Sequence, residues 1–165
     1  MAEDFYDVEF VKGQAVTQRR GIAWLKAKSN SSVNAKQVFD KCSTSDRSFL
    51  EASMSAWIDG KPDIATRYHG FANDAAFRFG MVFKWREERV QNRIYGFKMH
   101  PGIPDGRLEL CVLAMHTTKD TAETDRTVKV VINTLRNNVD VDKAIKRQVK
   151  EFFRKETRKR EGEKQ

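Results

Sequence analysis

The sequence has little cysteine, and its cysteines have no metal-binding partners. Cys42 and Cys111 are the two cysteines in 165 residues, and neither belongs to a CxxC pair. The three histidines, His69, His100 and His116, do not lie at zinc-ligand spacing from either cysteine. We therefore expect no metal site and two reduced thiols, as in a cytoplasmic protein, with a single disulfide as the alternative.

Long apolar runs and the common catalytic motifs are also missing. No apolar run approaches the roughly 18–20 residues of a membrane span. The N-terminal segment MAEDFYDVEFVKG lacks the basic-then-apolar order of a signal peptide. There is no GxGxxG, Walker A, HExxH or GxSxG motif and no internal repeat. These absences predict a cytoplasmic protein with no membrane partner and no cofactor.

Positive charge is abundant, and most of it lies near the C-terminus. The formal net charge is +8, and residues 143–160 contain nine Lys or Arg and two Glu, a net charge of +7. Such a segment is most often a solvated helix face, and the alternative is contact with nucleic acid or a ribosome. On that alternative, the candidate contacts in this segment are Lys146, Arg147, Lys150 and Arg154.

The first half of the chain is predicted to contain one strand and two main helices. YDVEFV (6–11) alternates between apolar and polar residues, which indicates a strand. TQRRGIAWLKAKS (17–29) is predicted as a short helix. A longer helix is expected between about 45 and 60, because Leu50, Met54, Trp57 and Ile58 recur on one helical face. Residues 63–74 are predicted to form a connecting loop.

The middle of the chain predicts an antiparallel meander of three strands. The first has apolar residues at every second position, which indicates one buried face: Phe77, Phe79, Met81, Phe83 and Trp85. The second, RIYGFKMH (93–100), places Tyr95, Phe97 and Met99 on one face. PGIPDG (101–106) is rich in turn residues. The third, RLELCVLAMH (107–116), is apolar at nearly every position, as in a central strand that is covered on both faces.

Two helices are expected after the meander. Val128, Val131, Ile132 and Leu135 lie on one helical face, and Asp120 is the predicted N-cap. The following helix is basic around a face that contains Ile145 and Val149. We therefore predict a single α+β domain over residues 1–140 and a basic C-terminal helix with a frayed tail over 141–165.

Four cations of the meander are candidates for one phosphate-binding patch. Lys84 and Arg86 alternate with the aromatic residues of the first strand, and Lys98 and His100 alternate with those of the second. If the aromatic residues share the buried side, these cations share the solvent-facing side. Lys and Arg donate charge-assisted hydrogen bonds to phosphate, and histidine can transfer a proton near neutral pH. The alternative is an exposed basic surface without a site. Arg93 lies two residues before Tyr95 and is therefore expected to start on the buried side. It is then either an arginine in a buried ion pair or one that reaches round the sheet edge to a cleft.

Short motifs in this region resemble those of bacterial RelE/HigB-like toxins, small ribonucleases of toxin–antitoxin modules. NRIYGF (92–97) is similar to the family's arginine strand, which reads roughly yRvlYf. VLAMHTTKDTAETD (112–125) is similar, without a gap, to the family's vLLhgFxKKTxKTP, and it places Lys119 at a family lysine. FKWR (83–86) falls where the family has a strand reading lwElR. The resemblance covers about residues 46–135.

The chain departs from the family pattern at several positions of the second motif. Asp120 replaces the family's second lysine, and Asp125 replaces its proline. His116 lies one residue away from the position of the family histidine. A shift of one residue reverses the face of a strand, so His116 is not carried over as a site residue.

The resemblance implies a RelE-like α+β fold and a metal-free, ribosome-associated endoribonuclease of a toxin–antitoxin or phage-derived module. In such an enzyme the RNA 2′-hydroxyl attacks the adjacent phosphate, and cations stabilise the charged transition state. The candidate catalytic residues are Arg86, Arg93, Lys98, His100 and Lys119. Lys84, Arg86 and Lys98 are also candidates for RNA contact. The implied partners are RNA or a ribosome, together with a cognate antitoxin protein.

The sequence is also compatible with two functions other than an endoribonuclease. The first is a non-catalytic protein that binds nucleic acid or a ribosome through its basic face and tail. The second is a protein-interaction domain whose basic helix docks on an acidic partner. Binding that weakens steeply with salt, without cleavage, would distinguish the first from an enzyme.

Overall fold

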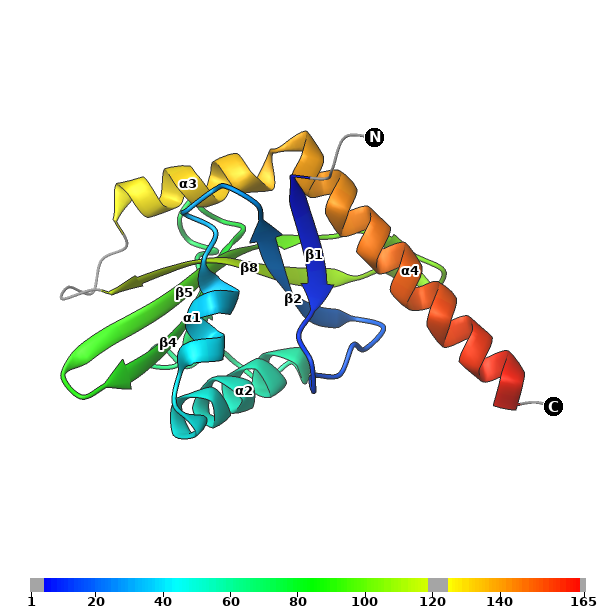
Figure 1. Cartoon of the computed structure of the whole chain (residues 1–165), viewed down its shortest axis with the longest axis horizontal. Helices are drawn as coiled ribbons and strands as arrows, with labels where there is room; N and C mark the ends of the chain where they lie inside the picture. Colours follow the sequence, from blue (N-terminus) through cyan, green and yellow to red (C-terminus); the bar gives the residue numbers. More distant parts are fainter. Residues whose placement is uncertain (1–4, 119–124, 164–165) are drawn as a thin grey trace.

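The computed structural model describes residues 5–118 and 125–163. Within these residues the chain forms a six-stranded mixed sheet and four helices. Figure 1 shows helices on both sides of the sheet, so the architecture has three layers. The predicted α+β class is confirmed, and the sheet is larger than the predicted meander.

The order of strands across the sheet is β1-β2-β8-β5-β4-β3. The strands are β1 (Tyr6–Phe10), β2 (Arg20–Ala27), β3 (Tyr68–Gly70), β4 (Gly80–Glu87), β5 (Val90–Met99) and β8 (Glu109–Thr118). Neighbours pair antiparallel, except that β2 and β8 are parallel. The predicted meander is present as β4, β5 and β8. A small hairpin of β6 (Gly102–Ile103) and β7 (Gly106–Arg107) lies between β5 and β8 in the chain.

Each face of the sheet is covered by two helices. α1 (Ala35–Lys41) and α2 (Thr44–Ile58) pack on the face that carries Trp24, Phe83 and Leu113. α3 (Arg126–Arg136) and α4 (Val139–Glu163) pack on the face that carries Tyr95 and Val112. Figure 1 shows α2 and α3 on opposite sides of the sheet. The central strands are therefore buried on both faces, and the prediction of a strand with one solvent-facing side is wrong for β4.

Segment 17–29, predicted as a short helix, contains strand β2 instead. Ile22, Ala23, Trp24 and Leu25 are all buried, two toward each layer of helices. A strand that is buried on both faces shows no alternation, so its sequence does not differ from that of a buried helix. The predicted loop 63–74 likewise contains the short edge strand β3.

Helices α2 and α3 begin at side-chain caps. Ser43 Oγ accepts a hydrogen bond from the Asp46 amide at 3.1 Å. Asp125 Oδ1 accepts one from the Thr127 amide at 2.7 Å. Such caps satisfy amides that lack an intrahelical partner. Asp125 therefore caps α3 in place of the predicted Asp120, which lies outside the described residues.

A bulge in the sheet fixes the position of α1. Tyr95 pairs with Met115 whereas Gly96 pairs with Leu113, so Ala114 is the extra residue of the bulge. The Ala114 carbonyl accepts a hydrogen bond from the Asn34 amide at 2.9 Å. Asn34 Oδ1 in turn accepts one from the His116 amide at 2.9 Å. Because Asn34 directly precedes α1, these two bonds attach the start of the helix to β8.

Candidate nucleic-acid interface

Lys84 and Arg93, both predicted on the sheet, lie directly opposite each other on β4 and β5 and are buried. Lys84 Nζ donates a hydrogen bond to the Ala65 carbonyl at 2.9 Å. The Arg93 guanidinium donates one to the Tyr95 hydroxyl at 3.3 Å. The prediction that Arg93 starts on the buried side is confirmed, whereas the solvent-facing position predicted for Lys84 is wrong. Helix α3 packs over β4 and β5 on this face, and Lys84 reaches the segment that precedes β3.

The structure does not bring the predicted patch together. Lys84 and Arg86 are on the face of β4 that carries Val82, which faces α3 and α4. Lys98 pairs with Cys111, which faces α1 and α2, so Lys98 is on the opposite face. Strand geometry also separates Arg93 from Lys98 by about 17 Å along β5. The expectation of a single patch is therefore wrong, because the aromatic residues of β4 and β5 pack against different layers.

The remaining predicted catalytic residues lie apart from one another. Arg86 is exposed beside the β4–β5 turn, and His100 is exposed beyond the other end of β5. Lys119 lies outside the described residues. Arg86 and Arg93 share one end of one face.

The structure places two arginines, Arg78 and Arg136, around one aromatic ring near the C-terminal end of β5. Their guanidinium carbons lie 4.6 Å and 3.8 Å from the centroid of the Phe79 ring. Arg136 Nε donates a hydrogen bond to the Lys98 carbonyl at 3.1 Å, and the His100 ring lies 6.4 Å from that of Phe79. Burial, with Arg78 nearby, lowers the pKa of Arg136. Sequence reasoning missed both arginines, because their meeting requires α3 to cross the sheet.

His69 and His116 are half-buried, and burial lowers the pKa of both below the ordinary value of 6.5. His116 Nε2 lies 2.8 Å from Asn92 Oδ1, and the His116 ring is 5.6 Å from that of Trp85. His69 Nδ1 lies 2.8 Å from the Gly70 carbonyl. His116 therefore belongs to the packing beneath α1 and α2 and is not part of a cationic surface.

We expect acidification to destabilise the fold through these two histidines. Because their folded-state pKa values are depressed, the unfolded chain binds more protons, and stability falls as the pH drops from about 7.5 to 5. Thermal unfolding of the wild type should show a lower midpoint at each step of that series. In a double variant, His69→Gln with His116→Gln, the midpoint should decline less steeply as the pH falls. The difference between the two proteins at the highest pH gives the change in midpoint that the substitutions cause by themselves. Equal declines in the two proteins would contradict this assignment.

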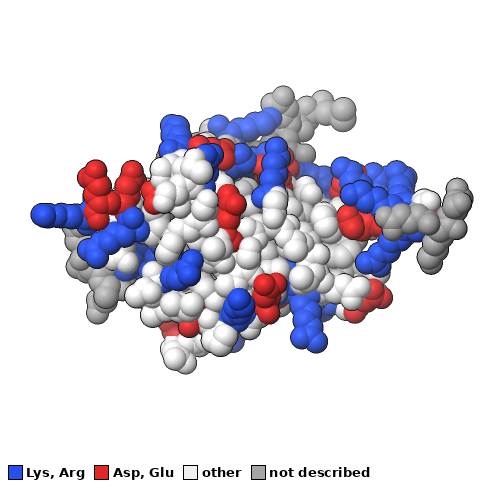
Figure 2. Space-filling model, turned by 90° about the horizontal axis from the view of Figure 1, so that it is seen from below, with Lys and Arg blue, Asp and Glu red and all other residues white. Residues whose placement is uncertain are grey.

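Helix α4 carries all four of the predicted tail cations and also belongs to the core. Val141, Ala144, Ile145 and Val149 are buried against the sheet. The predicted cations lie on the exposed side of the helix: Lys146, Arg147, Lys150 and Arg154. Figure 1 shows the last turns of α4 projecting beyond the sheet, and Figure 2 shows Lys and Arg side chains gathered around that end of the molecule.

Several of these cations have acidic neighbours at the surface. Lys146 Nζ lies 2.8 Å from Asp142, and Arg154 contacts both carboxylate oxygens of Glu151 at 2.7 Å and 2.8 Å. Arg147 lies 3.9 Å from Asp7. Exposed pairs of this kind contribute little to stability and are screened by salt. The cations can therefore exchange these partners for phosphate groups.

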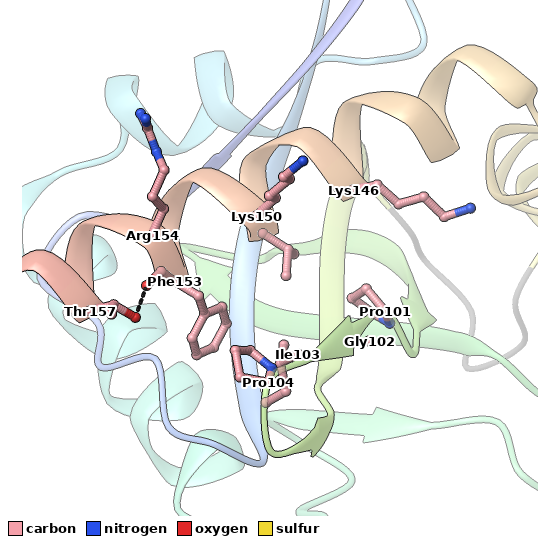
Figure 3. A pocket seen from close by; sticks show the side chains of 10 residues that line it. Pro101, Gly102, Ile103, Pro104, Lys146, Lys150, Phe153, Arg154 and Thr157 are labelled. Carbon is pink, nitrogen blue, oxygen red and sulfur yellow. Dashed lines mark hydrogen bonds between the residues drawn. The ribbon is translucent and has the colours of Figure 1, made fainter.

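A groove runs along α4 where the helix faces the β6–β7 hairpin, with a volume of about 590 Å³. Its lining consists of Pro101, Gly102, Ile103, Pro104, Lys146, Val149, Lys150, Phe153, Arg154 and Thr157. Figure 3 shows the Phe153 side chain pointing from α4 toward Pro104 and Ile103, and Lys150 and Arg154 pointing away from the hairpin. The groove thus has an apolar floor and a cationic rim.

No family model, curated protein or solved structure matches the chain. Within residues 5–118 and 125–163, no helix combines the length and the apolar character that crossing a membrane requires.

Proposed function

We propose that this chain is a cytoplasmic RNA-binding protein of the RelE/HigB-like type, which contacts RNA or a ribosome through the exposed cations of α4. The main support is the row formed by Lys146, Lys150 and Arg154, which stand about 6 Å apart along one side of the helix. All three are exposed, whereas Lys84 and Arg93 on the sheet are buried. Exposed cations in a row can follow a phosphate backbone, and the release of counterions then drives binding.

Replacing the row tests this proposal. A triple variant, Lys146→Gln, Lys150→Gln and Arg154→Gln, is expected to bind RNA about tenfold more weakly, because three phosphate contacts are lost. The slope of log Kd against log salt should decrease by about 2 for a single strand. Fluorescence anisotropy of a labelled RNA, measured over a series of salt concentrations, gives both quantities.

A matched control keeps the change in charge the same. Lys12, Lys41 and Lys61 are exposed and lie outside α4. Their triple replacement by glutamine should leave both the affinity and the salt slope close to those of the wild type. If the two triple variants weaken binding equally, the effect comes from net charge and the α4 interface is wrong. If the wild type binds no RNA at low salt, the proposed function itself is wrong.

The second candidate is the metal-free endoribonuclease that the RelE/HigB resemblance implies. The observation that favours it is the β4–β5–β8 meander, which has Arg93 in its middle strand and Arg86 on the same face. In this proposal the exposed Arg86 stabilises the phosphate as the 2′-hydroxyl attacks it, and the buried Arg93 adds positive charge on the same face. Lys98 and His100 have no part in it, because the fold holds them away from Arg86. Lys119, the other candidate for proton transfer, would accept the 2′-hydroxyl proton and donate one to the leaving 5′-oxygen. A cognate antitoxin remains the proposed protein partner.

Cleavage of messenger RNA in the presence of ribosomes, together with growth arrest on expression, tests the second candidate. Arg86→Ala should lower cleavage by about 100-fold, since a lost charge-stabilising donor has an effect of that size. Arg89, exposed in the same turn, provides the control, and Arg89→Ala should cleave as the wild type does. Wild-type protein that neither cuts RNA nor arrests growth would rule out the enzyme.

A further inference from the structure

The groove between α4 and the β6–β7 hairpin combines an apolar surface with a cationic one. Its floor is built from Ile103, Val149 and Phe153, together with Pro101 and Pro104. Its rim is cationic, and none of its ten lining residues is acidic. The volume of about 590 Å³ lies within the range of small-ligand sites. A complementary occupant therefore has an apolar, flat part and negative charges that lie outside the groove.

We infer that the groove takes an unpaired base of single-stranded RNA while the adjoining phosphates contact Lys146, Lys150 and Arg154. This inference rests on the proposed function and names the form of RNA that is bound. Bases of a single strand expose their faces and stack on aromatic side chains, whereas those of a duplex are stacked on one another. Phe153 supplies the aromatic surface, because its ring points into the groove (Figure 3).

The charges around Phe153 favour one side of the ring for the path of the RNA strand. A smaller hollow of about 190 Å³ lies behind the ring, and it is lined by Asp105 and Glu156 in addition to Arg160. These two carboxylates repel phosphate from that side. The groove has no such charge, and the distance from Lys146 to Thr157 along the helix is about 16 Å, enough for two or three nucleotides.

The first experiment compares two RNAs on the full chain. An eight-nucleotide single strand should bind more tightly than the blunt duplex of the same sequence, with both affinities measured by anisotropy. Phe153→Ala should weaken binding of the single strand by about tenfold, since a lost stacking contact has roughly that effect. The same variant should bind the duplex within twofold of the wild type, because duplex binding uses the cations alone.

A second variant keeps an aromatic ring and reports on the groove directly. Trp24, Trp57 and Trp85 are all buried, so their emission gives a steady background. In a Phe153→Trp variant, the single strand should quench the added emission and the duplex should not. Lys155→Trp, on another side of α4, is the matched reporter, and neither RNA should change its emission. The emission of the Phe153→Trp variant tests whether a base enters the groove even if the Phe153→Ala variant does not fold.

The results distinguish a failure of the groove inference from a failure of the proposed function. Equal affinity for the two RNAs, with unchanged emission of the Phe153→Trp variant, overturns the inference and leaves RNA binding by α4 intact. Failure of both RNAs to bind at low salt overturns both. Quenching by an acidic amphipathic peptide with Glu at every fourth position, but not by the single strand, would assign the groove to a protein partner and also overturn the inference.

Discussion

Replacing Gly96 with alanine is expected to lower the free energy of unfolding by about 3 kcal/mol or more, as overpacking at a rigid site does. A Cβ atom at Gly96 would lie 2.2 Å from the Val112 carbonyl oxygen and 2.9 Å from the Leu113 Cα. Both neighbours are backbone atoms of the paired strand β8, so no side-chain rotation can relieve the contact. The strands would have to separate at the bulge, in the middle of the sheet.

Urea or thermal unfolding followed by circular dichroism measures this effect. For a chain of this size, a loss of about 3 kcal/mol lowers the midpoint by roughly 6–12 °C. Gly102→Ala is the matched control, because a Cβ at Gly102 meets nothing within 4 Å. It should unfold within about 0.5 kcal/mol of the wild type, as surface substitutions usually do. Equal stability of the two variants would show that the β5–β8 register is not as described.

Removing residues 139–165 is expected to unfold the protein, although this segment contains the basic tail. Val141, Ile145 and Val149 are buried against the sheet, and burial of each such side chain contributes about 1.5–3 kcal/mol. Their summed contribution, about 5–9 kcal/mol, is comparable to the whole stability of a typical domain. Deletion would also uncover β1, on which α4 packs. The truncated chain should lose its cooperative thermal transition.

A shorter truncation separates the core part of α4 from its exposed end. Removing residues 158–165 takes away the exposed Arg158, Lys159 and Arg160 and none of the buried residues. Its thermal midpoint should remain within about 2 °C of the wild type, as for other surface changes. A cooperative transition in the protein that lacks 139–165 would contradict the packing of α4. Tests of RNA binding should therefore use point substitutions in place of deletion of the helix.

The periodicity of apolar residues was enough to predict the helices and strands whose two sides differ in the sequence. β1, α2 and the meander strands were predicted because each has a clear apolar periodicity, and the α4 cations were visible as a concentration of charge. β2 was predicted as a helix because Ile22–Leu25 are buried on both sides and show no period. The short strand β3 had too few residues to show any pattern.

The arrangement of the site depends on contacts that no local pattern contains. Lys84 and Lys98 were expected together because the aromatic residues of β4 and β5 were assigned to a single core. The fold has two cores, and α3 and α4, which come later in the chain, create the second. The groove was also hidden from the sequence, because the segment PGIPDG (101–106) predicts a turn and does not reveal that α4 packs beside it.

The parallel pairing of β2 with β8 has a consequence during translation. The β1–β2 hairpin is made early, but its neighbour in the sheet begins at Glu109, about 80 residues after β2 ends at Ala27. At synthesis rates of 5–20 residues per second, the hairpin waits roughly 4–16 s for that strand. During this interval the apolar edge of β2 is open to other chains. The nascent chain therefore exposes that edge for several seconds before β8 can pair with it.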